Sequence, residues 1–304
     1  MRESELHRRI AQRSLGMERS FDAVELGPGD DCAIVRTAGA LLVTVDQLVV
    51  GRHVEPGTPI ERIGRKAIAR SVSDIAAMAG TPVWAVATGL LPTDFAEADA
   101  LFEAMADAAN SLGCPLVGGD IATSPAAASE SAPLSLTVTV AGAVHAVRGA
   151  VLRSGARPGD GVYVTGSIGN SLASGWHLDF EPRAAEAAQL AHTLGDRLSA
   201  MIDISDGLGR DAGRIAEASG VGIIIESSAI PLRDGASDPV EAAGDGEDYE
   251  LLFTASGDVP AVCSGIDTTT ETPITRIGRV VEGAGCVIEV GGKRIDACEL
   301  GWDH

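Results

Sequence analysis

The chain has 304 residues, enough for two domains of about 150 residues each. Its net charge of −20, from 43 acidic and 23 basic residues, disfavours nucleic acid and anionic membranes as partners. Five cysteines with no C-x-x-C pair argue against a disulfide framework or a zinc site and fit reduced thiols in the cytoplasm. We expect a cytoplasmic protein, because residues 1–13 lack the apolar segment of a signal peptide and no apolar run is long enough to span a membrane.

Hydrophobic patterning predicts alternating strands and helices in the first half of the chain. A short polar helix is expected over 2–14, and a turn rich in Gly and Asp over 26–31. The segment 123–133 is rich in Ala, Ser and Pro, which favours a surface insertion over a designed lid. The other expected elements are strands over 32–35, 41–46, 83–91, 115–117 and 134–144, and helices over 59–78 and 94–112.

A polar stretch with Gly and Pro over 148–160 predicts a domain boundary near residue 148. The expected domains are therefore 1–148 and 149–304. In the second domain the pattern predicts strands over 161–166, 221–226, 250–254, 274–280 and 286–290, and helices over 167–177, 183–198 and 206–219. This alternation indicates an α/β or α+β fold with two layers per domain.

Two common nucleotide-binding loops are absent from the chain. It has no G-x-x-x-x-G-K-[ST] sequence and no G-x-G-x-x-G at the start of a helix. Gly291-Gly-Lys293 lies near the end of the chain and lacks the P-loop spacing. A P-loop kinase and a simple dinucleotide-binding protein are therefore disfavoured.

Acidic residues instead recur beside Gly, Ser or Thr, mostly where predicted strands end. The places are Gly29-Asp-Asp31, Thr44-Val-Asp46, Ser73-Asp74, Gly118-Gly-Asp120, Asp203-Ile-Ser-Asp-Gly207 and Gly246-Glu-Asp248. Any one of them alone is better explained as a turn or helix-cap residue. Taken together they favour a site for Mg²⁺, which prefers carboxylate oxygens. Because divalent cations let an acidic protein hold a polyphosphate, the sequence predicts an enzyme that transfers a phosphoryl group from ATP.

Nine segments along the chain resemble the thiamine-monophosphate kinase family and come in that family's order. They are GPGDDCAIV (27–35), TVDQLVVGRH (44–53), SDIAAMAGTP (73–82), VGGD (117–120), RSGARPGD (153–160), VTG (164–166), IDISDGL (202–208), GEDYELLF (246–253) and GWDH (301–304). The wider superfamily includes aminoimidazole ribonucleotide synthetase and selenophosphate synthetase, which bind ATP without a P-loop. The segments are spread from residue 27 to residue 304, so the resemblance extends over nearly the whole chain.

The resemblance implies a two-domain fold like that of aminoimidazole ribonucleotide synthetase. The N-terminal sheet would carry helices on one face and pair across a homodimer, and the C-terminal domain would be an α/β sandwich. The implied activity is phosphorylation of thiamine monophosphate to thiamine diphosphate by ATP and several Mg²⁺ ions, in a site between the domains. No general base is required, because the acceptor is an ionised phosphate that metals and positioning can activate.

The resemblance also assigns roles to individual residues. The implied metal ligands are Asp31, Thr44, Asp46, Asp74, Asp120, Asp203 and Asp206. The implied ATP contacts are Gly119, Asp120, Arg153 and Ser205. The implied contacts to thiamine phosphate are His53, Glu247 and Trp302. Arg153 suits a phosphate because its guanidinium can donate two parallel hydrogen bonds, and Trp302 offers a ring face to a cationic or flat heterocycle.

The chain departs from the family pattern in a few places, and two other functions stay open. Val45 replaces the second hydroxyl residue before Asp46, and Ile121-Ala122 replaces a pair of threonines. One alternative is a paralogue that uses ATP to activate another small substrate, such as an amide or a carbamoyl intermediate. The other is a regulatory dimer that binds nucleotide or metal without catalysis. His53, Glu247 and Trp302 favour the kinase over the first, and the retained aspartates argue against the second.

Overall fold

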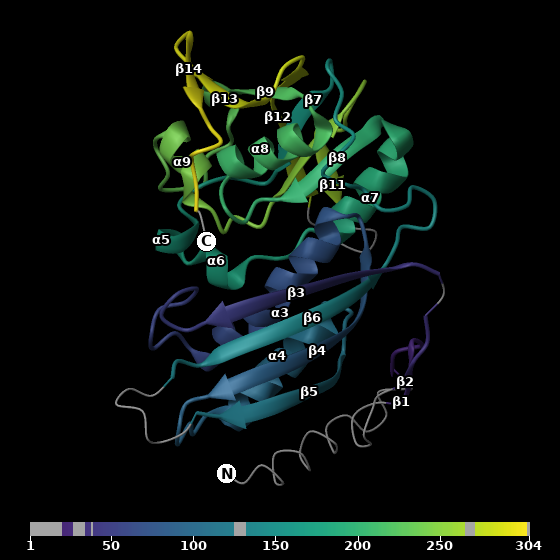
Figure 1. Ribbon diagram of the computed structural model, residues 1–304, viewed down its shortest axis with the longest axis vertical. Helices are drawn as coiled ribbons and strands as arrows, with labels where there is room; N and C mark the ends of the chain where they lie inside the picture. Colours follow the sequence, from purple (N-terminus) through teal and green to yellow (C-terminus); the bar gives the residue numbers. More distant parts are fainter. Residues whose placement is uncertain (1–19, 27–33, 38, 125–131, 265–270, 303–304) are drawn as a thin grey trace. The chain divides into compact units, whose positions relative to one another are not determined.

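The computed structural model describes residues 20–26, 34–37, 39–124, 132–264 and 271–302, which divide into two compact units (Figure 1). The first unit comprises Met1–Ile75 and Pro82–Ala143, and the second comprises Ala76–Thr81 and Val144–His304. The predicted helix over 2–14, the motif at 27–33 and most of the insertion at 123–133 lie outside the described residues. The predicted α/β fold class is confirmed.

The first unit is built on a four-stranded sheet of order β3-β6-β4-β5. Two helices, α3 and α4, lie on one face of this sheet (Figure 1). Gly64 on α3 permits their close packing, since a Cβ there would lie 2.8 Å from the Cβ of Ala104 on α4. The elements are β3 (Leu41–Val49), α3 (Ile60–Ala77), β4 (Thr81–Leu91), α4 (Ala98–Ser111), β5 (Leu116–Thr123) and β6 (Ser135–Ala143), with a small pair of strands, β1 (Val24–Leu26) and β2 (Ile34–Val35).

Side chains on β3 alternate between two different surroundings. Thr44 and Asp46 point to the side of the sheet where α3 lies, as their contacts with Asp74 and Arg70 on that helix show. Val43 and Val45 point the other way and are each 64% exposed. The side chain of Val45 therefore points away from Asp46, and its departure from the family pattern lies on the outer face of the sheet.

The second unit is built on an eight-stranded mixed sheet. Its main path runs β14-β13-β9-β12-β7-β10-β8, and β11 pairs with β12. The strands are β7 (Gly161–Thr165), β8 (Leu198–Asp203), β9 (Gly222–Glu226), β10 (Leu251–Ala255), β11 (Val262–Ser264), β12 (Glu271–Val281), β13 (Gly285–Val290) and β14 (Lys293–Asp296). The helices are α5 (Ser171–Ser174), α6 (Trp176–Asp179), α7 (Ala184–Leu194), α8 (Leu208–Ser219) and α9 (Pro239–Asp245), with 3-10 turns at Gly195–Arg197 and Ser227–Ala229.

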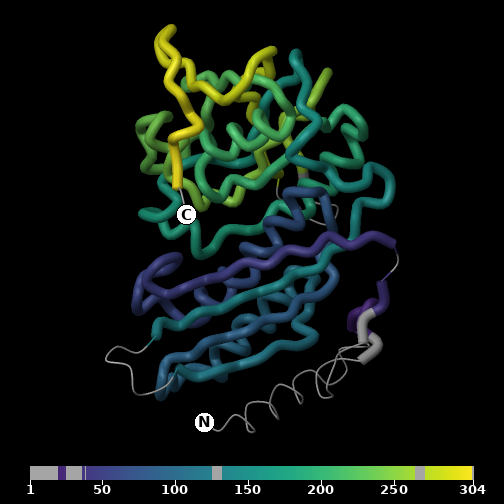
Figure 2. The backbone as a smooth tube through the Cα atoms, in the orientation of Figure 1, coloured from purple at the N-terminus to yellow at the C-terminus, as the bar shows by residue number. Residues whose placement is uncertain are grey.

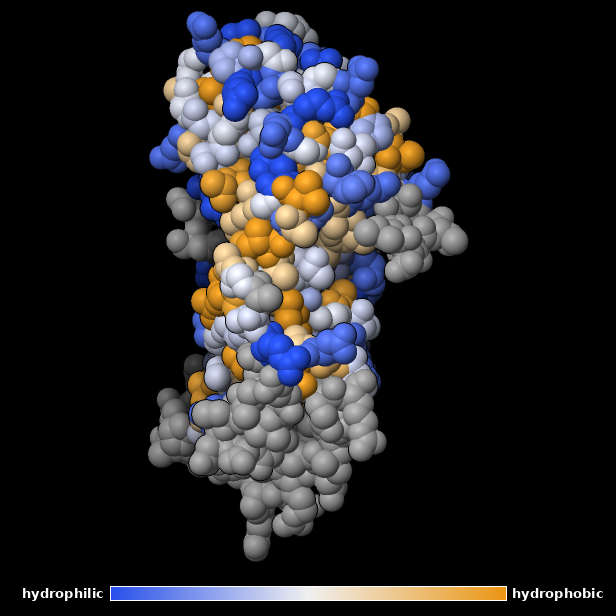
Figure 3. Space-filling view, turned by 90° about the vertical axis from the view of Figure 1, so that its right-hand side faces the viewer, coloured by the Kyte–Doolittle hydropathy of each residue, from blue (hydrophilic) through white to orange (hydrophobic). Residues whose placement is uncertain are grey.

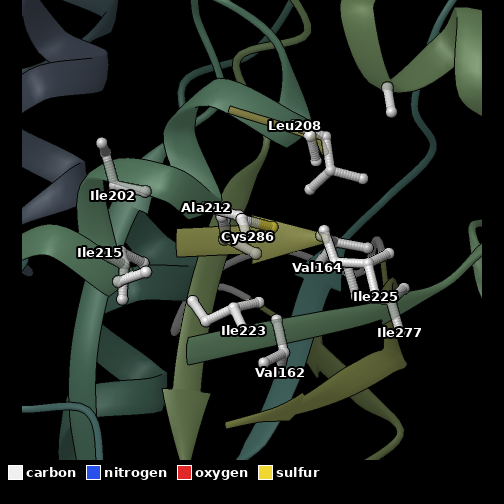
Figure 4. Packing of buried hydrophobic residues seen from close by; sticks show 14 of the residues in the cluster. Val162, Val164, Ile202, Leu208, Ala212, Ile215, Ile223, Ile225, Ile277 and Cys286 are labelled. Carbon is white, nitrogen blue, oxygen red and sulfur yellow. The ribbon is translucent and has the colours of Figure 1, made fainter. Parts of the chain in front are cut away.

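The central strands of this second sheet are apolar on both faces. On β7, Val162 and Val164 join one hydrophobic cluster with residues of α8, while Tyr163 joins another with residues of α7. Figure 4 shows the first cluster, in which Ala212 and Ile215 of α8 lie over the strands. Helices therefore cover both faces, and the second unit has three layers where the sequence predicted two.

Most long predicted elements match observed ones, and the differences lie in short segments. The helix expected over 167–177 is instead two single turns, α5 and α6, because the chain takes a left-handed conformation at Gly175 (φ 76°). The predicted strand 115–117 extends to Thr123. Strands β1, β8, β11 and β14 and helix α9 were not predicted. No helix in the described ranges combines the length and hydropathy that crossing a membrane requires.

Candidate functional site

Three of the predicted metal ligands lie together in the first unit. The Oγ1 atom of Thr44 donates a hydrogen bond of 2.5 Å to Oδ2 of Asp74, which joins β3 to α3. Asp46, two residues further along the same face of β3, has Oδ2 3.1 Å from Nε of Arg70, one helical turn before Asp74. Nη1 of Arg70 donates a hydrogen bond to the carbonyl oxygen of Gln47 (2.8 Å). Two carboxylates and a hydroxyl thus gather on one side of the sheet, with one arginine beside them.

This donor set suits a hard cation such as Mg²⁺, because it offers oxygen atoms only. Within the described part of the chain, no three His, Cys, Asp or Glu side chains are close enough to form a metal site by themselves. The first unit therefore brings together two predicted carboxylate ligands and one hydroxyl. Asp31, predicted as another ligand, lies outside the described residues.

Gly119 and Asp120 lie on β5, at the opposite edge of the sheet from β3. Two strands separate these edges, so within one sheet they are about 14 Å apart at about 4.8 Å per strand. Gly119 has a structural reason to be glycine, since a Cβ there would lie 2.1 Å from the carbonyl oxygen of Ala87 on β4. The structure thus places exposed Asp120 away from Asp46 within the unit, and the roles of both β5 residues stay predictions.

His53 lies in the loop that follows β3, and two contacts hold it there. Its Nδ1 accepts a hydrogen bond from the backbone N–H of Val49 (2.9 Å). Its carbonyl oxygen accepts one from Nζ of Lys66 (2.8 Å), a lysine that is fully buried in α3. Because Nδ1 is an acceptor, the ring carries its proton on Nε2.

In the second unit, Asp203 ends β8, and residues 204–207 lead into α8. Buried Asp211, in the first turn of α8, organises this loop by accepting hydrogen bonds of 3.1 Å from the backbone N–H groups of both Ser205 and Asp206. Arg214 donates to Oδ1 of Asp211 (2.6 Å) and is also paired with Asp206. The loop is therefore held by a carboxylate that no motif had indicated, and Asp206 already has a cationic partner.

Backbone hydrogen bonds join the turn at 246–249 to the loop at 204–207. The N–H of Glu247 donates to the carbonyl oxygen of Ser205 (2.7 Å), and the N–H of Tyr249 donates to that of Ile204 (2.8 Å). Glu247 and Tyr249 both have positive φ, at 54° and 52°. Such conformations are costly for residues with side chains and concentrate at functional sites.

Trp302, near the end of the chain, hydrogen-bonds to the loop at 204–207 and to Asp245 beside the turn at 246–249. In Figure 2 the yellow end of the chain reaches the second unit. Its backbone N–H donates to the carbonyl oxygen of Asp206 (2.9 Å), and its Nε1 donates to that of Asp245 (2.7 Å). Trp302 is 50% exposed although both of its N–H groups are hydrogen-bonded. We call Ser205, Asp206, Glu247 and Trp302, together with their supports, the second-unit site.

Residues of α5 and α6 complete the second-unit site, and sequence reasoning missed them. Nδ1 of His177 lies 3.1 Å from Oε2 of Glu247, and Oγ of Ser171 donates to the carbonyl oxygen of Glu247 (2.5 Å). Nε1 of Trp176 donates to the carbonyl oxygen of Asp248 (2.8 Å). None of the three lies in a segment that resembles the family, so no sequence signal pointed to them.

Arg153, predicted to contact ATP, lies in the exposed segment that leads into β7. Its carbonyl oxygen accepts a hydrogen bond of 3.2 Å from Ser219 at the end of α8. The same serine oxygen accepts from the backbone N–H groups of Gly155 and Ala156 (3.1 Å each). The backbone near Arg153 is therefore fixed while its side chain is in solvent. On the side drawn in Figure 3, hydrophilic residues dominate the top of this unit. The ATP contact stays a prediction.

Among the carboxyl groups of the second-unit site, that of Asp248 has the pKa that is shifted furthest from its usual value. Burial raises its pKa from 3.8 to about 7, although Arg233 and the N–H of Gly169 both lower it by binding Oδ1. Oδ2 makes no hydrogen bond to the described residues. Because the pKa is higher in the folded state than in the unfolded state, this group stabilises the fold below about pH 4, and that contribution is lost as the pH rises to about 7.

We expect Asp248→Asn to remove this pH dependence. The free energy of unfolding of the wild type relative to the variant should fall between pH 4 and pH 7, by at most about 1.4 kcal/mol per pH unit. Urea unfolding of both proteins across this range gives the difference directly, and taking the difference cancels the contribution of Asp211, whose pKa burial also raises, to about 6. If the difference in free energy of unfolding stays constant between pH 4 and pH 7, the raised pKa of Asp248 is contradicted.

The chain is similar to known proteins over nearly its whole length. Residues 29–144 match the family described as AIR synthase related protein, N-terminal domain, and residues 157–291 match its C-terminal domain. Thiamine-monophosphate kinase of Rhodopirellula baltica is 34% identical over 89% of this chain and 88% of its own. That of Escherichia coli K12 is 34% identical over 92% of each chain.

Solved structures give the same relation. Thiamine-monophosphate kinase from Stenotrophomonas maltophilia has a TM-score of 0.72 at 29% identity, over 92% of this chain and 94% of its own. AaThiL complexed with AMPPCP and TMP has a TM-score of 0.71 at 30% identity, over 100% and 99%. The hydrogenase maturation protein HypE in complex with ATP, at 20% identity and a TM-score of 0.71, shares the fold.

Proposed function

We propose that this chain, which belongs to the thiamine-monophosphate kinase family, transfers the γ-phosphoryl group of ATP to thiamine monophosphate and so produces thiamine diphosphate. The observation that carries this function is similarity along the full chain: identity of 34% to curated kinases and a match over 100% of the chain to AaThiL complexed with AMPPCP and TMP. The paralogue alternative is not favoured, since the HypE structures are 20–22% identical.

Mg²⁺ is the cation we propose for the first-unit donors. Asp46, Asp74 and Thr44 would hold it, with Asp31 and Asp120 as further predicted ligands. Bound there, it would neutralise phosphate charge that the carboxylates would otherwise repel. Support comes from the all-oxygen donor set around the 2.5 Å contact of Thr44 and Asp74, and Arg70 holds the Asp46 carboxylate in place.

The second-unit site is our proposal for holding the thiamine ring and part of the ATP. Glu247 offers a carboxylate to the amino-bearing pyrimidine or the cationic thiazolium, and Trp302 offers a half-exposed ring face. We propose that Arg153 and Ser205 contact ATP, that His53 donates from Nε2 to the substrate phosphate, and that Asp203 and Asp206 serve further Mg²⁺ ions. Asp206 would do so while paired with Arg214.

Few chemical steps are left to the protein's own side chains in this reaction. The acceptor phosphate of thiamine monophosphate is ionised at neutral pH, so no side chain has to remove a proton from it. What the chain supplies is orientation: substrate contacts from His53 and Glu247, and a rigid backbone at 204–207 and 246–249. Catalysis by alignment and charge stabilisation fits the rigid hydrogen bonding of both segments.

The proposed function is tested by product formation. Purified protein with ATP, Mg²⁺ and thiamine monophosphate should yield thiamine diphosphate, measured by separating the thiamine phosphates after conversion to fluorescent thiochromes. Thiamine in place of its monophosphate is the control and should give no product. ATP binding without thiamine diphosphate formation would refute the kinase and favour activation of another substrate.

A homodimer is the assembly we propose, formed through the outer face of the first sheet. The support is that α3 and α4, the two long helices described in this unit, lie on one face, while Val43 and Val45 expose apolar side chains on the other. Apolar strand surface of this kind marks interaction sites. We also propose a cytoplasmic location, for which the absence of disulfides among the four described cysteines is the support.

Val45→Glu should convert the dimer into monomers. Two copies of the new carboxylate would be buried near each other in an interface that excludes water, and burying an unpaired charge is costly. Sedimentation velocity of the variant gives the molecular mass. Val147→Glu, at a residue that is 85% exposed in the second unit, is the matched control and should leave the dimer intact. A wild-type monomer, or a Val45→Glu dimer, would contradict the proposed interface.

A further inference from the structure

His177 and Glu247 form a pair that none of the family segments indicates. Their side chains meet through Nδ1 and Oε2 at 3.1 Å, although 70 residues separate them in sequence. Both are largely shielded from solvent, with 11% and 16% of the side chain exposed. The other carboxylate oxygen, Oε1, lies 3.5 Å from the hydroxyl of Tyr249. The Glu247 carboxylate is therefore approached by hydrogen-bonding groups of His177 and Tyr249, which come from different segments.

The backbone on either side of this pair is fixed independently of it. Ser171 and Trp176 hydrogen-bond to the carbonyl oxygens of Glu247 and Asp248, at 2.5 and 2.8 Å. Arg233 lies 4.1 Å above the Trp176 ring and also pairs with Asp248. Because these contacts anchor α5 and α6 to the 246–249 turn without His177, the imidazole is not needed to join these segments.

The contact with His177 therefore acts on the Glu247 side chain, whose rotation it restricts. A free glutamate has three rotatable side-chain bonds and loses that freedom when it binds a ligand. A donor at Oε2 restricts the carboxylate to one orientation before the ligand arrives, and such preorganisation strengthens binding. The left-handed backbone at Glu247 already directs the side chain away from the usual strand or helix positions.

We propose that His177 is a positioning residue, which orients the Glu247 carboxylate to bind the amino-bearing or cationic ring of thiamine monophosphate. This inference rests on the proposed function and deepens it. His177 touches neither ATP nor the transferred phosphoryl group in this scheme. Loss of His177 should therefore weaken binding of thiamine monophosphate. Binding of ATP and the rate of the chemical step should stay unchanged.

Two polar substitutions separate this role from a structural one. The amide nitrogen of asparagine can take the place of Nδ1, whereas that of glutamine reaches about as far as Nε2. His177→Gln should raise the KM for thiamine monophosphate by about tenfold, the worth of one hydrogen bond to a charged group, with KM for ATP and kcat unchanged. His177→Asn should keep a KM near the wild-type value. His192→Leu, at an exposed histidine on α7, is the control and should change nothing.

Each outcome of these steady-state measurements decides the question. Equal KM values for thiamine monophosphate in wild type and His177→Gln, or an equal rise in both polar variants, would overturn the positioning role. A loss confined to kcat, together with a lower midpoint of thermal unfolding, would assign His177 to the fold. Should His177→Gln not fold, His177→Leu takes its place. It should raise the KM for thiamine monophosphate in the wild-type background and leave this KM unchanged in a Glu247→Gln background, and an equal rise in both backgrounds would overturn the positioning role. If wild type and His192→Leu form no thiamine diphosphate, the proposed function fails, and the inference fails with it.

Discussion

Asp46→Asn should lower kcat by on the order of 10²- to 10³-fold, the usual cost of removing one group that stabilises charge in a transition state. The amide keeps the shape of the side chain but loses the negative charge that attracts a cation. Arg70, which lies 3.1 Å from this carboxylate, retains its hydrogen bond to Gln47. Initial rates at saturating ATP, thiamine monophosphate and Mg²⁺ give the effect on kcat.

The fold should survive this substitution, because Asp46 is only partly buried and lies on a strand held by nine registered pairs with β6. We expect the free energy of unfolding to change by less than about 1 kcal/mol, as is typical of partly exposed ion pairs. Asp107→Asn removes a charge from an exposed residue of α4 in the same unit and should leave kcat unchanged. Full activity of Asp46→Asn would show that the proposed metal assignment is wrong.

Arg183→Leu should destabilise the protein by about 3–5 kcal/mol, because it would leave a buried carboxylate without its cation. Arg183 binds both oxygens of Glu250 at 2.7 Å through Nε and Nη2. Glu250 is 1% exposed, so no solvent replaces the lost partner. Urea unfolding at neutral pH measures the difference in free energy from the wild type.

Two further variants make that result specific. Arg279→Leu breaks pairs with Glu226 and Glu289 in which the arginine side chain is 40% exposed, and it should cost less than about 1 kcal/mol. Arg183→Leu combined with Glu250→Leu removes both charges and should recover much of the loss, since an apolar pair needs no compensation. A cost below about 1 kcal/mol for Arg183→Leu alone would mean that the buried pair does not stabilise this unit.

Long periodic elements could be predicted from the sequence because their patterns repeat over several turns. The helix expected over 59–78 is α3, Ile60–Ala77, and its end is marked by Gly80 and Pro82. Strand β8 could not be predicted, since six residues with both faces buried show no alternation. The helix predicted over 183–198 was therefore too long, since it included Leu198, the first residue of β8. The observed helix α7 ends at Leu194.

The same distinction applies to the second-unit site. The motifs at 202–208, 246–253 and 301–304 identified segments that the structure joins by backbone hydrogen bonds. Their supporting residues carried no such signal, because support depends on tertiary contacts. Asp211 and His177 reach the site only once α8 and α6 have folded against it.

Phosphoryl transfer from ATP to thiamine monophosphate is tested most directly by following the transferred group itself. With ATP labelled at the γ-phosphate, the label should appear in the terminal phosphate of thiamine diphosphate, in a one-to-one ratio with the ADP formed. Free labelled phosphate should not accumulate. If ADP forms while the label appears in free phosphate and thiamine monophosphate stays unchanged, the protein hydrolyses ATP or activates another substrate, and the kinase assignment is contradicted.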